Sequence, residues 1–81
     1  MRSAGEVFGQ RMKEIRQKRG LTQVELSQRS GFTQARVSEL EHGSRMPNLV
    51  TILRIAAALD CKVAELMSIF DEEGLSSLLP K

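Results

Sequence analysis

The sequence has one cysteine, one histidine and no long apolar run, and each shortage excludes a class of protein. Cys61 alone cannot form an intramolecular disulfide, so a reducing compartment is expected. Cys61 and His42 together are too few ligands for a Cys/His metal site. No apolar run approaches the roughly 20 residues that span a bilayer, and residues 1–6 lack the hydrophobic stretch of a signal peptide. We therefore expect a cytoplasmic protein without metal, cofactor or membrane contact.

Signals for catalysis and for β-strands are missing as well. The chain has no glycine-rich phosphate loop, and its carboxylates already have capping or pairing roles, so an enzyme is not expected. No segment alternates apolar and polar residues as a strand does. With 81 residues the chain is one domain, and its fold class is predicted to be all-α.

Charge is distributed unevenly along the chain, although the net charge is only +2. Residues 1–20 carry six basic and two acidic side chains, whereas residues 48–81 carry three basic and five acidic ones. A basic end of this kind favours an anionic partner near the N-terminal half.

Apolar periodicity and capping residues predict five helices. The first carries Phe8, Met12 and Ile15 at spacings of four and three and ends before Gly20. A loose start at residues 1–5 and a short tail at residues 71–81 flank a domain at residues 6–70. The expected helices cover residues 6–19, 23–30, 34–42, 49–59 and 63–70.

Residues 21–41 form the most informative stretch, because two short helices are joined there by a tight turn at residues 30–32. Thr22 and Glu25 have the spacing of a capping box. Gly31 can adopt a positive φ, and Thr33 can cap the next helix. Val37 and Leu40 face the core together, which leaves a varied polar face outside. The pattern predicts a helix-turn-helix.

The residues then match a known family across nearly the whole chain, residues 6–70. The matching residues are Gly20-Leu21-Thr22-Gln23, Leu26, Gly31, Val37-Ser38, Leu40-Glu41, Gly43, Pro47 and Thr51 through Leu59. In this combination and order the sequence resembles the lambda-repressor-like (Cro/XRE-type) helix-turn-helix family. The resemblance implies a compact five-helix domain with the helix-turn-helix at its second and third helices. It further implies a transcriptional regulator, a repressor, that binds double-stranded DNA as a homodimer on a palindromic operator.

The resemblance also implies site residues. Arg16 pairs with Glu41 to join the first and third helices, which is chiefly a structural role. The base-reading positions are Gln34, Ala35, Arg36, Ser38 and Glu39. The phosphate-binding positions that it implies are Gln23, Ser44 and Arg45, and we expect Thr33 and Arg11 to bind phosphate as well.

Each base-reading side chain has its own chemistry in a major groove. Gln34 can pair with adenine, Ala35 can touch a thymine methyl, and Arg36 can pair with guanine or fall back on a phosphate. Glu39 accepts from cytosine or repels phosphate in wrong registers. Ala35 and Glu39 replace the amides that some family members use, which leaves the operator sequence open. For each residue a merely solvated helix face is the alternative.

Two other features depart from the core pattern of the domain. Lys62 stands at the cap of the fifth helix, where its side chain cannot accept amide hydrogen bonds. The fourth and fifth helices and Leu75, Leu78 and Leu79 carry more apolar surface than a small core needs. That surplus predicts a homodimer interface through these helices and the tail, unless the tail folds back over its own core. An antitoxin-like or adaptor protein that binds another protein through the same helices is the alternative function.

Overall fold

The computed structural model describes residues 2–75 and 79–80 and contains five α-helices, with no strand in that part of the chain. The helices are α1 (Ala4–Lys18), α2 (Gln23–Ser30), α3 (Gln34–His42), α4 (Leu49–Leu59) and α5 (Val63–Glu73). The predicted all-α, five-helix fold is confirmed. None of the described helices is long and apolar enough to cross a membrane.

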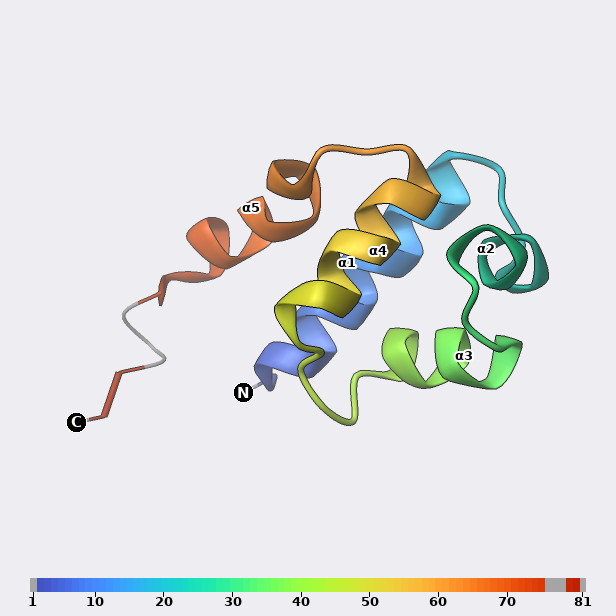
Figure 1. Ribbon diagram of the computed structural model, residues 1–81. Coiled ribbons are helices and arrows are strands. Elements are labelled where there is room, and N and C mark those ends of the chain that lie inside the picture. The colour runs from blue at the N-terminus through green and yellow to red at the C-terminus, as the bar shows by residue number, and fades with distance from the viewer. Residues whose placement is uncertain (1, 76–78, 81) are drawn as a thin grey trace.

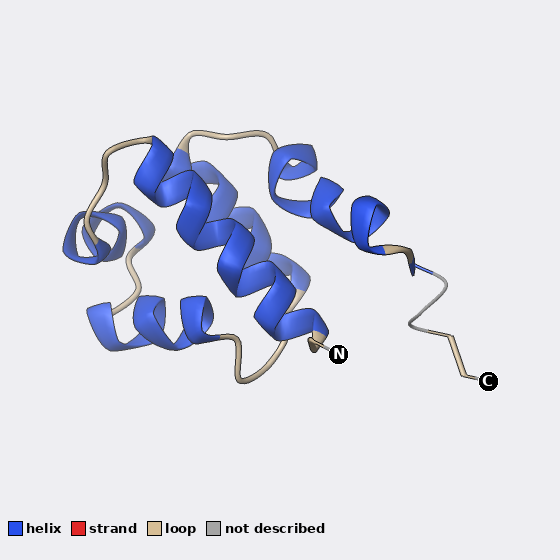
Figure 2. Ribbon diagram, turned by 180° about the vertical axis from the view of Figure 1, so that it is seen from behind, coloured by secondary structure: helices blue, strands red, loops and turns tan. Residues whose placement is uncertain are grey.

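The α2–α3 pair lies at one end of the molecule and α5 at the other (Figures 1 and 2). The longest helix, α1, packs against α3 and α5, while α4 packs against α2 and α5. The inner sides of α2 and α3 are therefore each held by a longer helix, α2 by α4 and α3 by α1.

Three of the predicted helices, α2, α3 and α4, match the structure at both ends because their caps are strong local signals. Asn48 accepts a hydrogen bond from the Thr51 amide at 2.9 Å and so begins α4. Gly31 and Gly43 end α2 and α3 with φ of 78° and 81°, the left-handed region that glycine adopts without a steric penalty.

The start of α1 differs from the expected loose segment at residues 1–5. The Ser3 hydroxyl accepts from the Glu6 amide at 3.2 Å, and the Glu6 carboxylate accepts from the Ser3 amide at 3.0 Å. This capping box starts the helix at Ala4, two residues before the predicted start. The loose start is thereby corrected from Ser3 onward, and Met1 lies outside the described residues.

The end of α5 also differs from the expected boundary at residue 70. The helix continues to Glu73, so much of the acidic run assigned to the tail is helical. The side chain of Lys62 makes no cap hydrogen bond, as predicted, and the Glu65 carboxylate instead accepts from the Lys62 amide at 3.3 Å. Leu75 and Leu79 are exposed, so neither covers the core. Leu78 lies outside the described residues.

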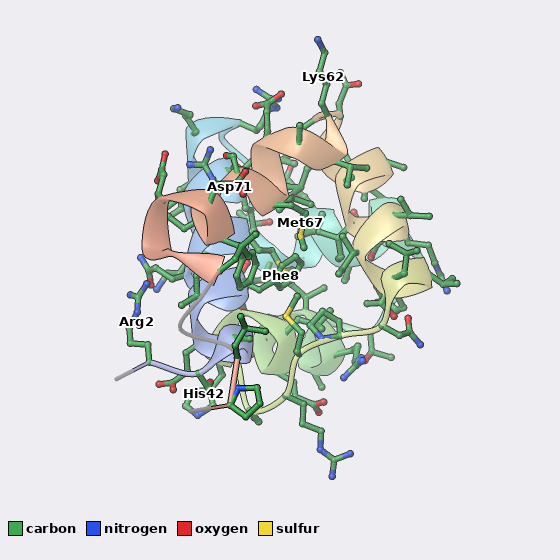
Figure 3. The ribbon with its side chains drawn as sticks, turned by 90° about the vertical axis from the view of Figure 1, so that its left-hand side faces the viewer. Arg2, Phe8, His42, Lys62, Met67 and Asp71 are labelled. Carbon is green, nitrogen blue, oxygen red and sulfur yellow. The ribbon has the colours of Figure 1, made fainter. Side chains whose placement is uncertain are left out.

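The core draws a fully buried side chain from every helix. Figure 3 shows Phe8 in the interior, with Met67 of α5 near it and Lys62 pointing outward. Burial of each large side chain contributes about 1.5 to 3 kcal/mol relative to an exposed one. Because Val37 and Leu40 belong to this core, the orientation of α3 is set by the same packing that holds the domain together. The largest fully buried side chains are those of Phe8, Met12, Leu26, Leu40, Ile55, Leu59, Leu66 and Val37.

Two glycines of α1 allow that helix to lie directly on the C-terminal end of α3. A Cβ added to Gly9 would lie 2.5 Å from the Glu41 carbonyl oxygen and 2.6 Å from that of Leu40. A Cβ on Gly5 would lie 2.6 Å from the Gly43 carbonyl oxygen. The obstacles are backbone atoms, so the two helices can approach this closely only without side chains at these positions.

Candidate nucleic-acid interface

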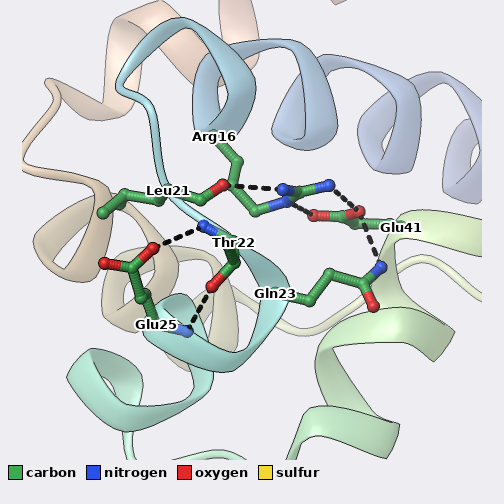
Figure 4. Close-up of polar contacts among 6 residues, drawn as sticks. All are labelled: Arg16, Leu21, Thr22, Gln23, Glu25 and Glu41. Atoms are coloured by element: carbon green, nitrogen blue, oxygen red, sulfur yellow. Dashed lines mark hydrogen bonds and ion pairs between the residues drawn. The ribbon is translucent and has the colours of Figure 1, made fainter.

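The junction between α1, α2 and α3 is built around the carboxylate of Glu41 (Figure 4). Its Oε2 accepts from Arg16 Nε at 2.6 Å, and its Oε1 accepts from Arg16 Nη2 at 3.1 Å. Gln23 Nε2 donates to the same Oε1 at 3.1 Å, and Arg16 Nη1 donates to the Leu21 carbonyl oxygen at 2.7 Å. The Arg16 and Glu41 side chains are only 10% and 4% exposed. A buried, two-point ion pair with further hydrogen bonds ties the end of α3 to the start of α2.

Gln23 therefore links the start of α2 to the end of α3. It is half-buried at the first position of α2, with its side-chain nitrogen donating to Glu41. The expected phosphate contact of Gln23 stays a prediction.

The turn between α2 and α3 is held by a residue that the sequence reading did not single out. Arg54 of α4 donates through Nη2 to the Ser30 carbonyl oxygen at 2.7 Å. Its guanidinium carbon lies 4.1 Å from the centre of the Phe32 ring, a cation–π contact. Arg54 thus holds the turn from a position 24 residues beyond Ser30 in the chain, and no local pattern signals such a contact.

The outward face of α3 presents the predicted base-reading residues. Thr33 caps the helix by accepting from the Arg36 amide at 3.0 Å. Gln34, Ala35, Ser38 and Glu39 are exposed, whereas Arg36 is half-buried at the flank of this face. Arg36 Nη1 donates to Glu39 Oε1 at 2.6 Å, so two of the predicted readers are paired with each other in the free protein.

A groove of about 660 Å³ separates the flank of α3 from the loop at residues 44–48. We call it the loop groove. Arg45 contributes a cation that has no hydrogen bond or ion pair with any described residue. The groove therefore has the charge expected of a surface that contacts DNA backbone. Its lining residues are Arg36, Glu39, Leu40, Ser44, Arg45, Met46, Pro47 and Asn48.

Arg11 is not part of this assembly. Its Nε donates to the Glu65 carbonyl oxygen of α5 at 2.9 Å, and its Nη1 lies 3.7 Å from Glu14. The structure thus places the Arg11 side chain against α5, and its expected phosphate contact stays a prediction. Arg19 is likewise engaged, donating to the carbonyl oxygens of Leu59 and Asp60. Much of the basic charge of α1 therefore joins helices instead of facing a partner.

Metal or thiol chemistry finds no support at this surface. No cluster of three or more potential metal ligands exists among the described residues. Cys61 is half-buried and packs against the core, and burial raises the pKa of its thiol, which disfavours the reactive thiolate.

The capped α2–α3 pair, the buried junction and the outward polar face together define a helix-turn-helix domain of the DNA-binding type. A family model described as Helix-turn-helix matches residues 12–66. An uncharacterized HTH-type transcriptional regulator, y4dJ, from Sinorhizobium fredii is 39% identical over 67 residues, which are 83% of this chain and 87% of that protein. The chain belongs to the Cro/C1-type (XRE) helix-turn-helix family of DNA-binding transcriptional regulators, which are not enzymes.

Solved structures agree with this assignment. The restriction-modification controller protein C.AhdI from Aeromonas hydrophila is 42% identical and superimposes with a TM-score of 0.72, covering 76% of this chain and 94% of that one. The clp gene regulator ClgR from C. glutamicum has a TM-score of 0.83 over 90% of this chain and 95% of that one. At 23% identity, the second likeness establishes the compact five-helix fold alone.

Proposed function

We propose that this protein is a sequence-specific repressor that inserts α3 into the major groove of operator DNA. The observation that carries the proposal is the rigid mounting of α3: its inner side chains are in the core and its C-terminal end is locked by the Arg16–Glu41 pair. A helix fits the major groove, and a fixed helix can present Gln34 and Ser38 to base edges in one register. The similarity to a restriction-modification controller protein supports a regulatory role.

Phosphate contacts are assigned to both sides of α3. Thr33 and Gln23 lie at the N-terminal ends of α3 and α2, where backbone amides favour anions. Ser44 and Arg45 line the loop groove on the other side. These contacts would fix the register in which the base-reading face meets the DNA.

The active species in this proposal is a homodimer that uses the exposed face of α4. Leu49, Val50 and Leu53 are 65%, 66% and 46% exposed, and Val63 at the start of α5 is 38% exposed. Apolar side chains gathered on one helix face are a mark of an interaction surface. A second copy of the chain would bury that face in a two-fold arrangement, which matches a palindromic operator.

The same α4 face also favours the second candidate, an antitoxin-like or adaptor role in which a different protein covers it. The two functions predict different masses for the purified protein. A stable monomer that binds a heterologous partner through Leu49 and Val50 would favour the adaptor role.

In vitro selection from a random duplex library tests the proposed function. The expected consensus contains two inverted half-sites about 10 base pairs apart, one helical turn of DNA. A selection that enriches no sequence over the starting library would contradict it.

A further inference from the structure

Glu39 is held against Arg36 in the free protein, and this pairing has consequences for how α3 reads DNA. The two side chains are three residues apart on α3, with Arg36 Nη1 2.6 Å from Glu39 Oε1. They are 40% and 58% exposed. An exposed pair of this kind adds little to folding stability, so its main effect falls on what the two groups can bind.

The position of the pair places it at the edge of the base-reading face. On a helix of 3.6 residues per turn, Arg36 lies between the buried Leu40 and the exposed Glu39. Both Arg36 and Glu39 line the loop groove, beside Arg45, which has no partner among the residues that the structure describes. The loop groove therefore holds two cations and one carboxylate, with the carboxylate already used by one cation.

Binding of DNA through Arg36 Nη1 competes with its hydrogen bond to Glu39. If Arg36 turns to a phosphate, the Glu39 carboxylate is left unpaired close to other phosphates, which repel it. In the major groove, however, guanine offers two acceptors to arginine, and cytosine offers an amino group that a carboxylate can accept from. A site with a guanine beside a cytosine supplies replacements for both halves of the pair.

We propose that Arg36 and Glu39 act as one composite reader, in which Glu39 withholds Arg36 from phosphates and releases it at a step that offers guanine to Arg36 and a neighbouring cytosine to Glu39. The inference rests on the proposed function and deepens it, since it names a feature of the operator. Glu39 is then a specificity-determining residue that weakens binding to non-specific DNA and favours binding to the operator sequence.

The test compares the wild type with Glu39→Gln, which keeps the shape of the side chain and removes its charge. The matched control is Glu14→Gln, because Glu14 is an exposed carboxylate that pairs with Arg11 at the same spacing on α1, outside the α2–α3 pair. For each protein, fluorescence anisotropy measures affinity for a selected operator and for a shuffled duplex over a range of salt, and in vitro selection gives the preferred bases.

Glu39→Gln is expected to bind the shuffled duplex about fivefold more tightly than the wild type, with a salt dependence steeper by about one phosphate contact. The cytosine preference should disappear and give way to adenine, which a glutamine side chain reads, while the guanine preference of Arg36 stays. Glu14→Gln should change none of these quantities beyond the small effect of net charge.

Two results would overturn the inference, and only the second would also refute the proposed function. If the wild type discriminates between sequences but Glu39→Gln behaves as Glu14→Gln does, the composite reader is refuted and the proposed function stands. If the wild type binds every duplex equally, the proposed function is refuted and the inference falls with it.

Discussion

At the scale of single residues, the buried carboxylate of Glu41 is the group on which the interface most depends. It joins three helices through Arg16 and Gln23, and its partner Arg16 also holds the Leu21 carbonyl. Removal of one member leaves the other as an uncompensated buried charge. Substitution of either Arg16 or Glu41 should therefore destabilise the fold mainly because the other charge stays buried without a partner.

Glu41→Gln should lower the free energy of unfolding by about 3 to 5 kcal/mol, because it strands the buried Arg16 guanidinium. Urea denaturation followed by circular dichroism measures this loss. The control on the same helix is Glu39→Gln, an exposed carboxylate whose loss should cost less than about 1 kcal/mol. Equal effects of the two substitutions would show that burial of the Arg16–Glu41 pair carries no special weight.

Gly9→Ala should destabilise the domain by about 1 to 3 kcal/mol, although alanine is the better helix former by about 1 kcal/mol. The added Cβ would lie 2.5 Å from the Glu41 carbonyl oxygen, and helix backbone cannot yield as a flexible side chain can. Thermal denaturation of Gly9→Ala and of Gln10→Ala, an exposed neighbour, gives the comparison. A Gly9→Ala protein more stable than the wild type would refute the close α1–α3 approach.

At the scale of helices, local capping signals determined which parts of the fold were predictable. The boundaries of α2, α3 and α4 follow from Thr22, Thr33 and Asn48, whose caps act within three residues. Ser3 and Glu6 form the same kind of capping signal for α1, but the apolar periodicity alone placed the start of that helix two residues too late. The helix-turn-helix and its outward face were therefore readable from sequence.

Contacts between distant segments were not readable in the same way. Nothing near Arg11 and Arg19 in the sequence indicates that they donate to backbone carbonyls that lie 54 and 40 residues further along the chain. Arg54 clamps the turn at Ser30, and the Gly5–Gly9 face of α1 is defined by backbone it meets in α3. Such roles depend on how helices pack, which no local pattern encodes.

The capping boxes predict a loss of stability in acid. Hydrogen bonding to the Thr22 backbone amide lowers the pKa of Glu25 from its ordinary value of 4.5, and the Ser3 amide lowers the pKa of Glu6 in the same way. A lowered folded-state pKa stabilises the fold above the unfolded value, and this stabilisation is lost as the pH falls through the folded value. The melting temperature should therefore drop as the pH falls below about 4.5.

Glu25→Gln should weaken this acid dependence, with a lower melting temperature than the wild type at pH 7 and a shallower fall in acid. Calorimetric scans between pH 7 and pH 3 measure both. Glu72→Gln is the control, since Glu72 is an exposed carboxylate near the end of α5 that caps no helix. An unchanged acid profile in Glu25→Gln would exclude the capping box as a source of the pH dependence.

At the scale of the whole molecule, the outward face of α3 and the exposed apolar face of α4 have different proposed roles. The α2–α3 end presents polar and basic groups, whereas Leu49, Val50 and Leu53 leave apolar side chains exposed on α4. In the proposed homodimer, contact between the two α4 faces sets the distance between the two α3 helices. Loss of dimerisation should therefore weaken DNA binding without altering α3.

Leu53→Glu should convert the dimer into a monomer and lower operator affinity by about tenfold or more, because a charge would be buried in the interface and the second half-site contact would be lost. Sedimentation velocity gives the mass, and anisotropy gives the affinity. Gln17→Glu adds the same charge at an exposed site on α1 and should change neither. A wild-type protein that is monomeric on and off DNA would contradict the dimer.

The central claim is that the outward face of α3 selects the DNA sequence, and the ratio of affinities for the selected operator and a shuffled duplex tests it most directly. That ratio should be about 10³ or more for the wild type at physiological salt. In the double variant Gln34→Ala, Ser38→Ala it should fall by about tenfold or more, while affinity for the shuffled duplex stays the same. A ratio unchanged by the double substitution would contradict the account.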